Sequence, residues 1–316
     1  MSVTALQKAE KPTGADAKAP RRRRGREARV SRATSWLLAI TSILIGLVML
    51  FPIVWMVFTA FKPEADIVSY PPTLWPRELT LEHFVEVWER IPFARLYVNT
   101  IIFAGGVTLI SLLFDSMAAY ALARIPFKGR GIVFVGILLL LMLPFQVTLI
   151  PLYDMLNGLG LTNTLPGLII PRMTNAFGIF FLTQFFLSLP KDLEEAARVD
   201  GASEWRIYWG IIMPLARPAL LTLGLFHFQY NWNDLLWPLV MSSSVETSTL
   251  PAGLALFMGQ HVVEYGLLMA GSLLALLPVI IFFLLIQRSF VGDRDDRLEV
   301  TSARTRTHRT TRKDAA

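Results

Sequence analysis

Six apolar stretches, each about long enough to cross the hydrocarbon core of a membrane, set the main constraint on the fold of this 316-residue chain. A membrane-spanning helix needs about 20 consecutive, mostly apolar residues. The mean hydropathy of +0.50 is too high for an ordinary soluble domain of this length. We therefore expect an all-α polytopic membrane protein with six transmembrane helices. The predicted spans are 36–61, 98–122, 131–151, 166–187, 219–240 and 266–287.

The basic residues predict the orientation of these spans. Short connections rich in Lys and Arg remain on the cytoplasmic side of a membrane. Ten basic residues precede Trp36, eight follow Ile286, and the connection 123–130 contributes three more. The connection 241–265 contains none, and in 62–97 acidic residues outnumber basic ones. Both termini are therefore expected in the cytoplasm, as an even number of spans requires.

The two ends of the chain are polar, unlike the apolar part between them. We expect a basic, disordered cytoplasmic tail over 1–35, a six-helix membrane domain over 36–291 and a polar cytoplasmic tail over 292–316. The run of four arginines from Arg21 fits a topology signal that also contacts anionic lipid better than a nucleic-acid site, because it precedes a span. The first apolar stretch exceeds the roughly 7–15 residues of a cleavable signal peptide, so it is expected to remain as an anchor.

A charged segment, 188–218, interrupts the apolar pattern between the fourth and fifth spans, and we call it the elbow. It contains five acids and four bases, a density that a bilayer core does not accommodate. We expect two short cytoplasmic helices. Asp192 is the predicted N-cap of the first, with Glu195 completing a capping box. Asp200-Gly201 ends that helix, and Ser203 is the predicted cap of the second.

The second predicted helix of the elbow carries an aromatic face that suits a membrane interface. The residues with this helical spacing are Trp205, Tyr208, Trp209 and Ile212. Pro214 and Pro218 then mark the return into the bilayer, because proline is tolerated at the entrance of a helix but disturbs its interior.

Polar residues inside the predicted spans are candidates for a polar pathway through the membrane, because such groups are costly in lipid and usually face a cavity or another helix. They are Asn99, Asp115, Gln146, Asn175, Gln184, Gln229, Asn231, Asn233 and Asp234. One run combines amides with aromatic rings, the groups that bind sugar hydroxyls and pack on sugar rings. It consists of Gln229, Tyr230, Asn231, Trp232 and Asn233. The same amides also bridge neighbouring membrane helices, so a structural role is the alternative.

The chain lacks the residues that several kinds of chemistry require. The chain contains no cysteine, which excludes disulfides, thiolate metal sites and cysteine nucleophiles. Its four histidines show no metal-ligand spacing, and no nucleotide-binding loop of the form Gly-x-x-x-x-Gly-Lys-Ser/Thr occurs. We expect no cofactor and no metal. His227, within the fifth span, is the one histidine considered for a functional role.

The elbow resembles the cytoplasmic signature of a known family. Its string consists of Glu195-Ala196-Ala197, Asp200-Gly201-Ala202, Ile212, Pro214 and Pro218. This is similar to the integral-membrane permease subunits of ATP-binding-cassette importers, in the maltose-type group that takes up carbohydrates. The resemblance covers about 36–291 and includes Asn231-Trp232-Asn233-Asp234 in the fifth span. It departs after the last span, where Asp293-Arg294-Asp295-Asp296 follows in place of a Gly-rich tail containing lysine.

The resemblance implies a non-catalytic translocation subunit of a sugar importer in the bacterial cytoplasmic membrane. The implied partners are a dimer of ATPase subunits, a second permease subunit that is a different chain, a substrate-binding protein outside the cytoplasm, and membrane lipid. No nucleic-acid partner is implied. The elbow is expected to couple ATP binding to transport through Glu195, Ala196, Ala197, Asp200, Gly201, Ala202 and Trp205.

Three other interpretations stay open. In the first, the same kind of importer transports another polar solute, such as a polyol phosphate. An intramembrane enzyme uses Asp115 and Asp234 as a catalytic pair, although no nucleophile or metal motif accompanies them. A standalone carrier uses these two acids for ion coupling, which predicts transport without ATP.

Overall fold

The computed structural model describes residues 32–259 and 263–285, and within these ranges the regular elements are all helices. The predicted all-α class is therefore confirmed for the described part of the chain. The predicted tail 292–316 and residues 1–31 of the predicted N-terminal tail lie outside it.

The chain divides into two compact units, Met1–Phe51 and Pro52–Ala316. The helix α1 (Arg32–Ala60) contains Pro52 and includes the first predicted span. The packing described below lies within the second unit.

Three uninterrupted helices in the described part of the chain are long and apolar enough to cross a membrane. They are Trp36–Ala60 within α1, α4 (Phe93–Arg124) and the helix Tyr265–Leu285. These correspond to the first, second and sixth predicted spans.

The third and fourth predicted spans each consist of two helices that meet at a bend. α5 (Arg130–Leu141) and α6 (Phe145–Gly158) meet at 99°. Pro144 lies at this break, and proline cannot donate the backbone hydrogen bond that continues a helix. The helical stretch Leu165–Arg172 meets α8 (Ala176–Ser188) at 42°.

The fifth predicted span, 219–240, is also interrupted. α12 (Arg217–Trp232) meets the preceding helical stretch at 76° and ends eight residues before the predicted end. Asp234 favours this early end, because its carboxylate accepts a hydrogen bond from the amide of Trp237 (3.3 Å) at the start of α13 (Leu236–Met241). Counting each bent pair as one crossing gives up to six spans.

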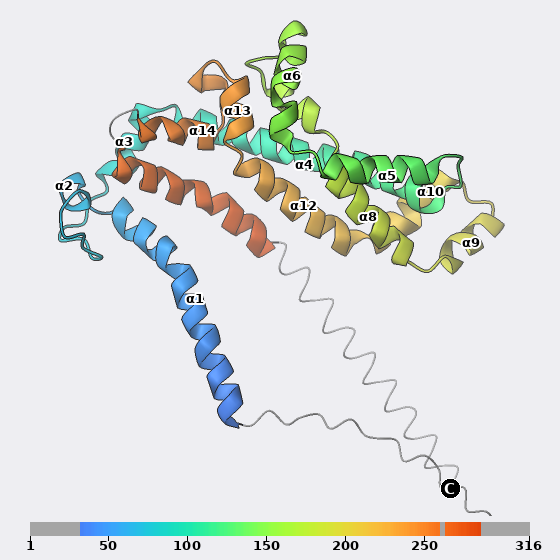
Figure 1. Cartoon of the computed structure of the whole chain (residues 1–316), viewed down its shortest axis with the longest axis horizontal. Helices are drawn as coiled ribbons and strands as arrows, with labels where there is room; N and C mark the ends of the chain where they lie inside the picture. Colours follow the sequence, from blue (N-terminus) through green and yellow to red (C-terminus); the bar gives the residue numbers. More distant parts are fainter. Residues whose placement is uncertain (1–31, 260–262, 286–316) are drawn as a thin grey trace, which may run out of the picture. The chain divides into compact units, whose positions relative to one another are not determined.

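The helix α4 occupies the centre of the second unit, with α8 and α12 packed along it (Figure 1). α9 (Asp192–Val199) and α10 (Glu204–Ile207) lie near its C-terminal end, and α3 (Glu82–Arg90) and α14 (Leu250–Leu254) lie near its N-terminal end (Figure 1). An apolar core at the C-terminal end joins the elbow to α4 and α8; its buried members include Ala119, Leu182, Phe186, Ile207 and Ile212. The elbow is therefore a packed part of the fold.

The remaining elements are short. They are α2 (Glu64–Ile67), α3 (Glu82–Arg90), α7 (Leu165–Ile169), η1 (Ile170–Arg172), α9 (Asp192–Val199), α10 (Glu204–Ile207), η2 (Tyr208–Ile212), α11 (Met213–Leu215), η3 (Val245–Thr247), α14 (Leu250–Leu254) and η4 (Ala255–Met258).

Candidate functional site

Gly201 ends the first helix of the elbow in a left-handed turn. Its φ of +77° is a conformation that glycine adopts readily because it lacks Cβ. The amide of Ala202 donates to the carbonyl of Ala197 (2.9 Å), and the amide of Gly201 donates to that of Arg198 (3.1 Å). This is the hydrogen-bond pattern that commonly closes a helix at glycine. The predicted break at Asp200-Gly201 is confirmed.

The two predicted helix caps have different outcomes. Ser203 caps α10, since its hydroxyl accepts a hydrogen bond from the amide of Arg206 (3.3 Å). The predicted capping box of Asp192 and Glu195 is wrong. Lys191 occupies the N-cap position of α9 without a side-chain cap, and Asp192 is already helical. Acids in the first turn still interact favourably with the helix dipole.

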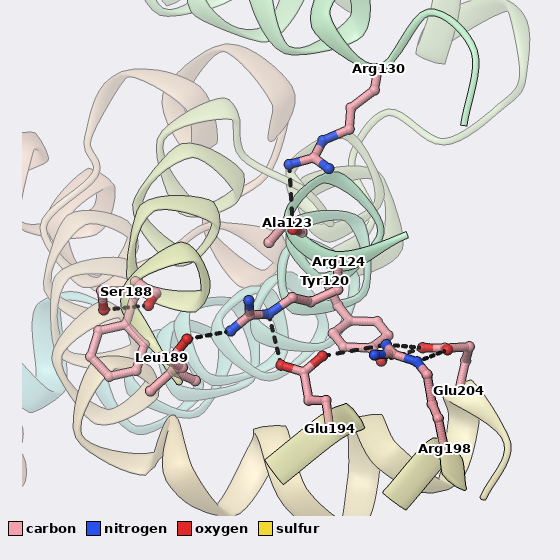
Figure 2. Close-up of polar contacts among 10 residues, drawn as sticks. Tyr120, Ala123, Arg124, Arg130, Ser188, Leu189, Glu194, Arg198 and Glu204 are labelled. Atoms are coloured by element: carbon pink, nitrogen blue, oxygen red, sulfur yellow. Dashed lines mark hydrogen bonds and ion pairs between the residues drawn. The ribbon is translucent and has the colours of Figure 1, made fainter. Parts of the chain in front are cut away.

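Two consecutive acids of α9 have opposite environments. Glu195 is exposed, whereas Glu194 is buried against the C-terminal end of α4. Arg124 Nε lies 2.8 Å from Glu194 Oε1, and each of these side chains is only 2% exposed (Figure 2). Arg124 Nη2 also donates to the carbonyl of Leu189 (2.8 Å), just after α8. Arg124 therefore connects α4 to both ends of the turn that leads into α9.

A second set of contacts completes the arrangement in Figure 2. Arg198 Nε donates to Glu204 Oε1 (2.6 Å), and Arg198 Nη2 donates to Glu204 Oε2 (3.1 Å). The Tyr120 hydroxyl donates to Glu204 Oε2 (2.6 Å). The hydrogen bond with Glu204 raises the pKa of Arg198, so its guanidinium stays protonated. We call Tyr120, Arg124, Glu194, Arg198 and Glu204 the elbow network.

The predicted coupling residues divide into an exposed and a packed group. Glu195, Ala196, Asp200, Gly201 and Trp205 are exposed. Ala197 and Ala202 are half-buried and pack on the apolar core of the elbow. A groove of about 740 Å³ lies beside α9, lined by residues that include Arg130, Lys191 and Glu195. The exposed group is therefore accessible at the surface of this chain.

The predicted aromatic face of the elbow is split. Trp205 and Trp209 are exposed, whereas Tyr208 and Ile212 are buried in the core. The helix widens to a π-helix over η2, which changes the direction of successive side chains. The Tyr208 hydroxyl is 2.7 Å from the hydroxyl of Ser116 on α4. Half of the predicted interface face therefore anchors the elbow.

Sequence reasoning did not single out Tyr120, Arg124 or Glu194 as functional residues. From the sequence, Arg124 is one of the basic residues that predict the orientation of the spans, and Glu194 is one of the five acids of the elbow. The signal available was that Arg124 and the elbow share the predicted cytoplasmic face. The partner of each charge depends on how α4 and α9 pack, which one sequence does not specify.

A second site is a cavity of about 860 Å³ beside the C-terminal half of α12. The predicted pathway residues Gln229, Tyr230 and Asn233 line it, together with Asn175, Phe177, Phe226, His227, Asp234, Leu235 and Leu236. Volumes of about 300–1,000 Å³ are typical of small-molecule sites. The cavity brings amides and aromatic rings together, as a sugar site requires.

Trp232 and Asn231 of the predicted pathway are not among the cavity's lining residues. Trp232 is 1% exposed, and its Nε1 donates to the carbonyl of Ala275 (3.1 Å) in the helix Tyr265–Leu285. Asn231 Nδ2 donates to the carbonyl of His227 (2.8 Å). Trp232 therefore ties α12 to the helix Tyr265–Leu285, whereas the Asn231 amide group bonds within α12.

Arg172, outside the predicted set, forms an ion pair next to the cavity. Its Nη2 lies 2.6 Å from Asp234 Oδ2, and its Nη1 donates to Asn231 Oδ1 (3.0 Å). The guanidinium also lies 4.7 Å from the centre of the Phe145 ring and 5.6 Å from that of Tyr230. The charge of Asp234 at the cavity is thus balanced by a nearly buried cation.

Asp115 forms a separate polar cluster on α4. Its Oδ1 accepts hydrogen bonds from the Thr174 hydroxyl (2.8 Å) and the Asn175 amide (2.9 Å), at the bend that precedes α8. His227 Nε2 lies 3.5 Å from Asp115 Oδ2. A Cβ added at Gly178 would lie 2.0 Å from this Oδ2, so the close approach requires glycine. Asp115 and Asp234 have different partners, which does not support a catalytic pair.

Comparison with known proteins gives a consistent result. Residues 115–292 match the family described as "Binding-protein-dependent transport system inner membrane component". The arabinooligosaccharides transport system permease protein of Halalkalibacterium halodurans is 35% identical over 84% of this chain and 96% of its own length. The sn-glycerol-3-phosphate transport system permease protein of Escherichia coli O1:K1 is 33% identical over 79% of this chain and 92% of its own length.

A solved structure is similar in fold. It belongs to a bacterial ABC transporter involved in the import of the acidic polysaccharide alginate. The match has a TM-score of 0.73 and 26% sequence identity, and it covers 83% of this chain and 98% of that chain. The similarity in sequence and the similarity in fold therefore both extend over most of the second unit.

Proposed function

This chain belongs to the family of inner-membrane components of binding-protein-dependent transport systems, and on that premise we propose that it translocates a sugar or sugar derivative with energy from a separate ATPase. It is a permease subunit of an ATP-binding-cassette importer, located in the cytoplasmic membrane. The observation that carries the proposal is a packed elbow that exposes Glu195 and is joined by α12 to a polar cavity.

The elbow is the proposed contact with the ATPase. Glu195, Ala196 and Asp200 are exposed on α9 or directly after it. Small alanines permit close approach of a partner, and exposed acids suit its polar surface. Ala197 and Ala202 pack inward instead, which keeps the exposed group in a fixed orientation. The elbow therefore transmits movement as a unit.

The proposed topology has six crossings with both termini in the cytoplasm. It follows from the basic connections and from counting each bent helix pair as one crossing. The elbow then lies inside, where an ATPase binds. The connections 62–97 and 241–265 lie outside, where a substrate-binding protein delivers its cargo. A second permease subunit completes the pathway.

The charges near the cavity favour an uncharged sugar over a polyol phosphate. Among the described residues that line the cavity, none is lysine or arginine. The nearby Arg172 is already paired with Asp234 and Asn231. A phosphate group is commonly bound by unpaired Arg or Lys side chains. The amides of Gln229 and Asn233 match the hydroxyls of a neutral sugar.

Affinity purification from membranes tests the proposal. A tagged chain is compared with a Glu195→Arg, Gly201→Asp variant, and the co-purifying proteins are identified. Glu78→Arg, which reverses an exposed acid in 62–97, is the matched control. We expect an ATP-binding protein with the wild type and the control, and its loss from the elbow variant. Absence of any ATPase from the wild type would support the carrier interpretation instead.

The same preparation tests the cargo. A substrate-binding protein recovered with the complex is expected to gain thermal stability with a neutral oligosaccharide and to show no change with sn-glycerol 3-phosphate. Stabilisation by the phosphate alone would contradict the proposed class of cargo.

A further inference from the structure

The elbow network connects three helices pairwise (Figure 2). Arg124 joins α4 to α9 through Glu194 (2.8 Å), and Arg198 joins α9 to α10 through Glu204 (2.6 Å). Tyr120 then joins α4 to α10 through Glu204 (2.6 Å). Because the contacts form a closed set, rotation of any one of the three helices relative to the others would stretch at least one of them.

The charges of the network are balanced within the chain. It contains two guanidinium groups and two carboxylates, and Glu194 also receives Arg198 Nη2 at 3.4 Å. Removing one member of a buried ion pair leaves an uncompensated charge, which is strongly unfavourable. The side chains of Arg124 and Glu194 are each 2% exposed and lie at the wall of the groove beside α9, which Arg198 and Glu204 also line. Their contacts serve the internal structure of the subunit.

The helix α4, which the network holds, also contacts residues that line the cavity. Asp115 lies nine residues before Arg124 on α4, and it binds Thr174 and Asn175 at the bend before α8. Asn175 and His227, which faces Asp115, both line the cavity. At about 1.5 Å of rise per residue, the two ends of this route are about 14 Å apart along α4.

We propose that Arg124 and Glu194 are positioning residues for transport, which fix the elbow to α4 so that movement of α9 moves the cavity wall. This inference rests on the proposed coupling function. The two consecutive acids then have separate roles. Glu195 contacts the ATPase, and Glu194 passes the movement of the elbow to α4.

The test uses the assembled importer in lipid nanodiscs and one engineered thiol. The chain contains no cysteine, so Val199→Cys, at a position that is 88% exposed, gives this subunit a single site for a nitroxide spin label. A labelled importer without Val199→Cys corrects for thiols in the partner chains. The variants are Glu194→Gln, Arg124→Gln and the exchange Arg124→Glu with Glu194→Arg. Asp192→Asn, at an exposed acid of the same helix outside the coupling set, is the matched control.

Spin-label mobility and the amount of cargo moved per ATP hydrolysed are both measured. We expect Glu194→Gln and Arg124→Gln to increase the mobility and to lower the transport ratio at least about fivefold, the lower end of typical coupling effects. The exchange is expected to restore both readouts toward the wild type. Asp192→Asn is expected to change neither the mobility nor the transport ratio. A role in folding alone would lower the amount of importer without changing the transport ratio of what remains.

The outcomes separate this inference from the proposed function. Wild-type mobility and a wild-type ratio in both single variants would overturn the inference while leaving coupled transport intact. A wild-type complex without ATP-driven uptake would overturn the proposed function itself. If the single variants do not assemble, Glu194→Asp decides, because it keeps the charge but shortens the reach to Arg124. For Glu194→Asp, increased spin-label mobility together with a lower transport ratio supports the inference, whereas wild-type values of both readouts overturn it.

Discussion

Tyr230 and Trp232 are two positions apart on α12 and have different surroundings. Tyr230 is 61% exposed and lines the cavity, whereas Trp232 is 1% exposed. Trp232 packs against Phe228 and Tyr97, with ring centres 5.5 and 5.8 Å away. Of the two rings predicted to contact a sugar, only that of Tyr230 is therefore placed to do so.

This difference predicts that one substitution changes stability and the other changes cargo uptake. Trp232→Ala is expected to lower the free energy of unfolding by about 3–5 kcal/mol, because it leaves a large buried void. Tyr230→Ala is expected to change that free energy by no more than about 1 kcal/mol and to raise the KM for cargo uptake. Thermal unfolding of the purified importer and uptake kinetics in vesicles measure the two quantities. A raised KM for Trp232→Ala at normal stability would restore Trp232 as a contact for cargo.

At the scale of elements, the turn after α9 gives a graded prediction. A Cβ added at Gly201 meets no heavy atom within 4 Å, so substitution there strains only the backbone. A left-handed conformation costs a typical L-residue about 1–2 kcal/mol, and asparagine tolerates it better. ATP-driven uptake is expected to decrease in the order Gly201, Gly201→Asn, Gly201→Ala, Gly201→Val. Equal loss in all three variants would show that the glycine serves close approach of a partner rather than the turn.

Local signals made parts of the elbow predictable. The turn at Gly201 and the cap at Ser203 depend on a few neighbouring residues, and both are confirmed. The capping box at Asp192 is wrong because α9 begins one residue earlier than that pattern requires. The different environments of Glu194 and Glu195 depend on where α4 ends. That information lies about 70 residues away in the sequence.

The third, fourth and fifth spans were predicted as continuous helices, and this part of the prediction is wrong. Tertiary contacts and local chain breaks bend or end these helices although the sequence stays apolar. Apolar composition predicts the third and fifth spans, and each corresponds to a bent helix pair whose two helices pass the length and composition test for a span only together. It does not show that a 99° bend lies at Pro144, or that a new helix, α13, begins at Leu236, where Asp234 accepts a bond from the Trp237 amide. The cavity arises at such an interruption, because Asn233, Asp234 and Leu235 follow the end of α12. Continuous spans would have left these residues in a helix.

At the scale of the whole molecule, the three bent helix pairs leave the number of crossings to be measured. The cysteine-free sequence allows one thiol at a time to be introduced and tested with a membrane-impermeant maleimide. Exposed positions are available in each proposed connection. Those expected outside are Tyr70, Leu159 and Ser243, and those expected inside are Lys128 and Val199.

With six crossings, the three outer cysteines react in intact spheroplasts, and the two inner ones react only after the membrane is permeabilised. Each alternative gives its own pattern, because a pair that does not cross reverses the sides of the positions that follow it. If α5 and α6 form a re-entrant loop, Leu159 becomes inaccessible and Val199 becomes reactive from outside. If only the α12 pair fails to cross, Ser243 alone changes sides. Reactivity of Val199 in intact spheroplasts would place the elbow outside, where no ATPase can bind it, and would contradict the coupling function.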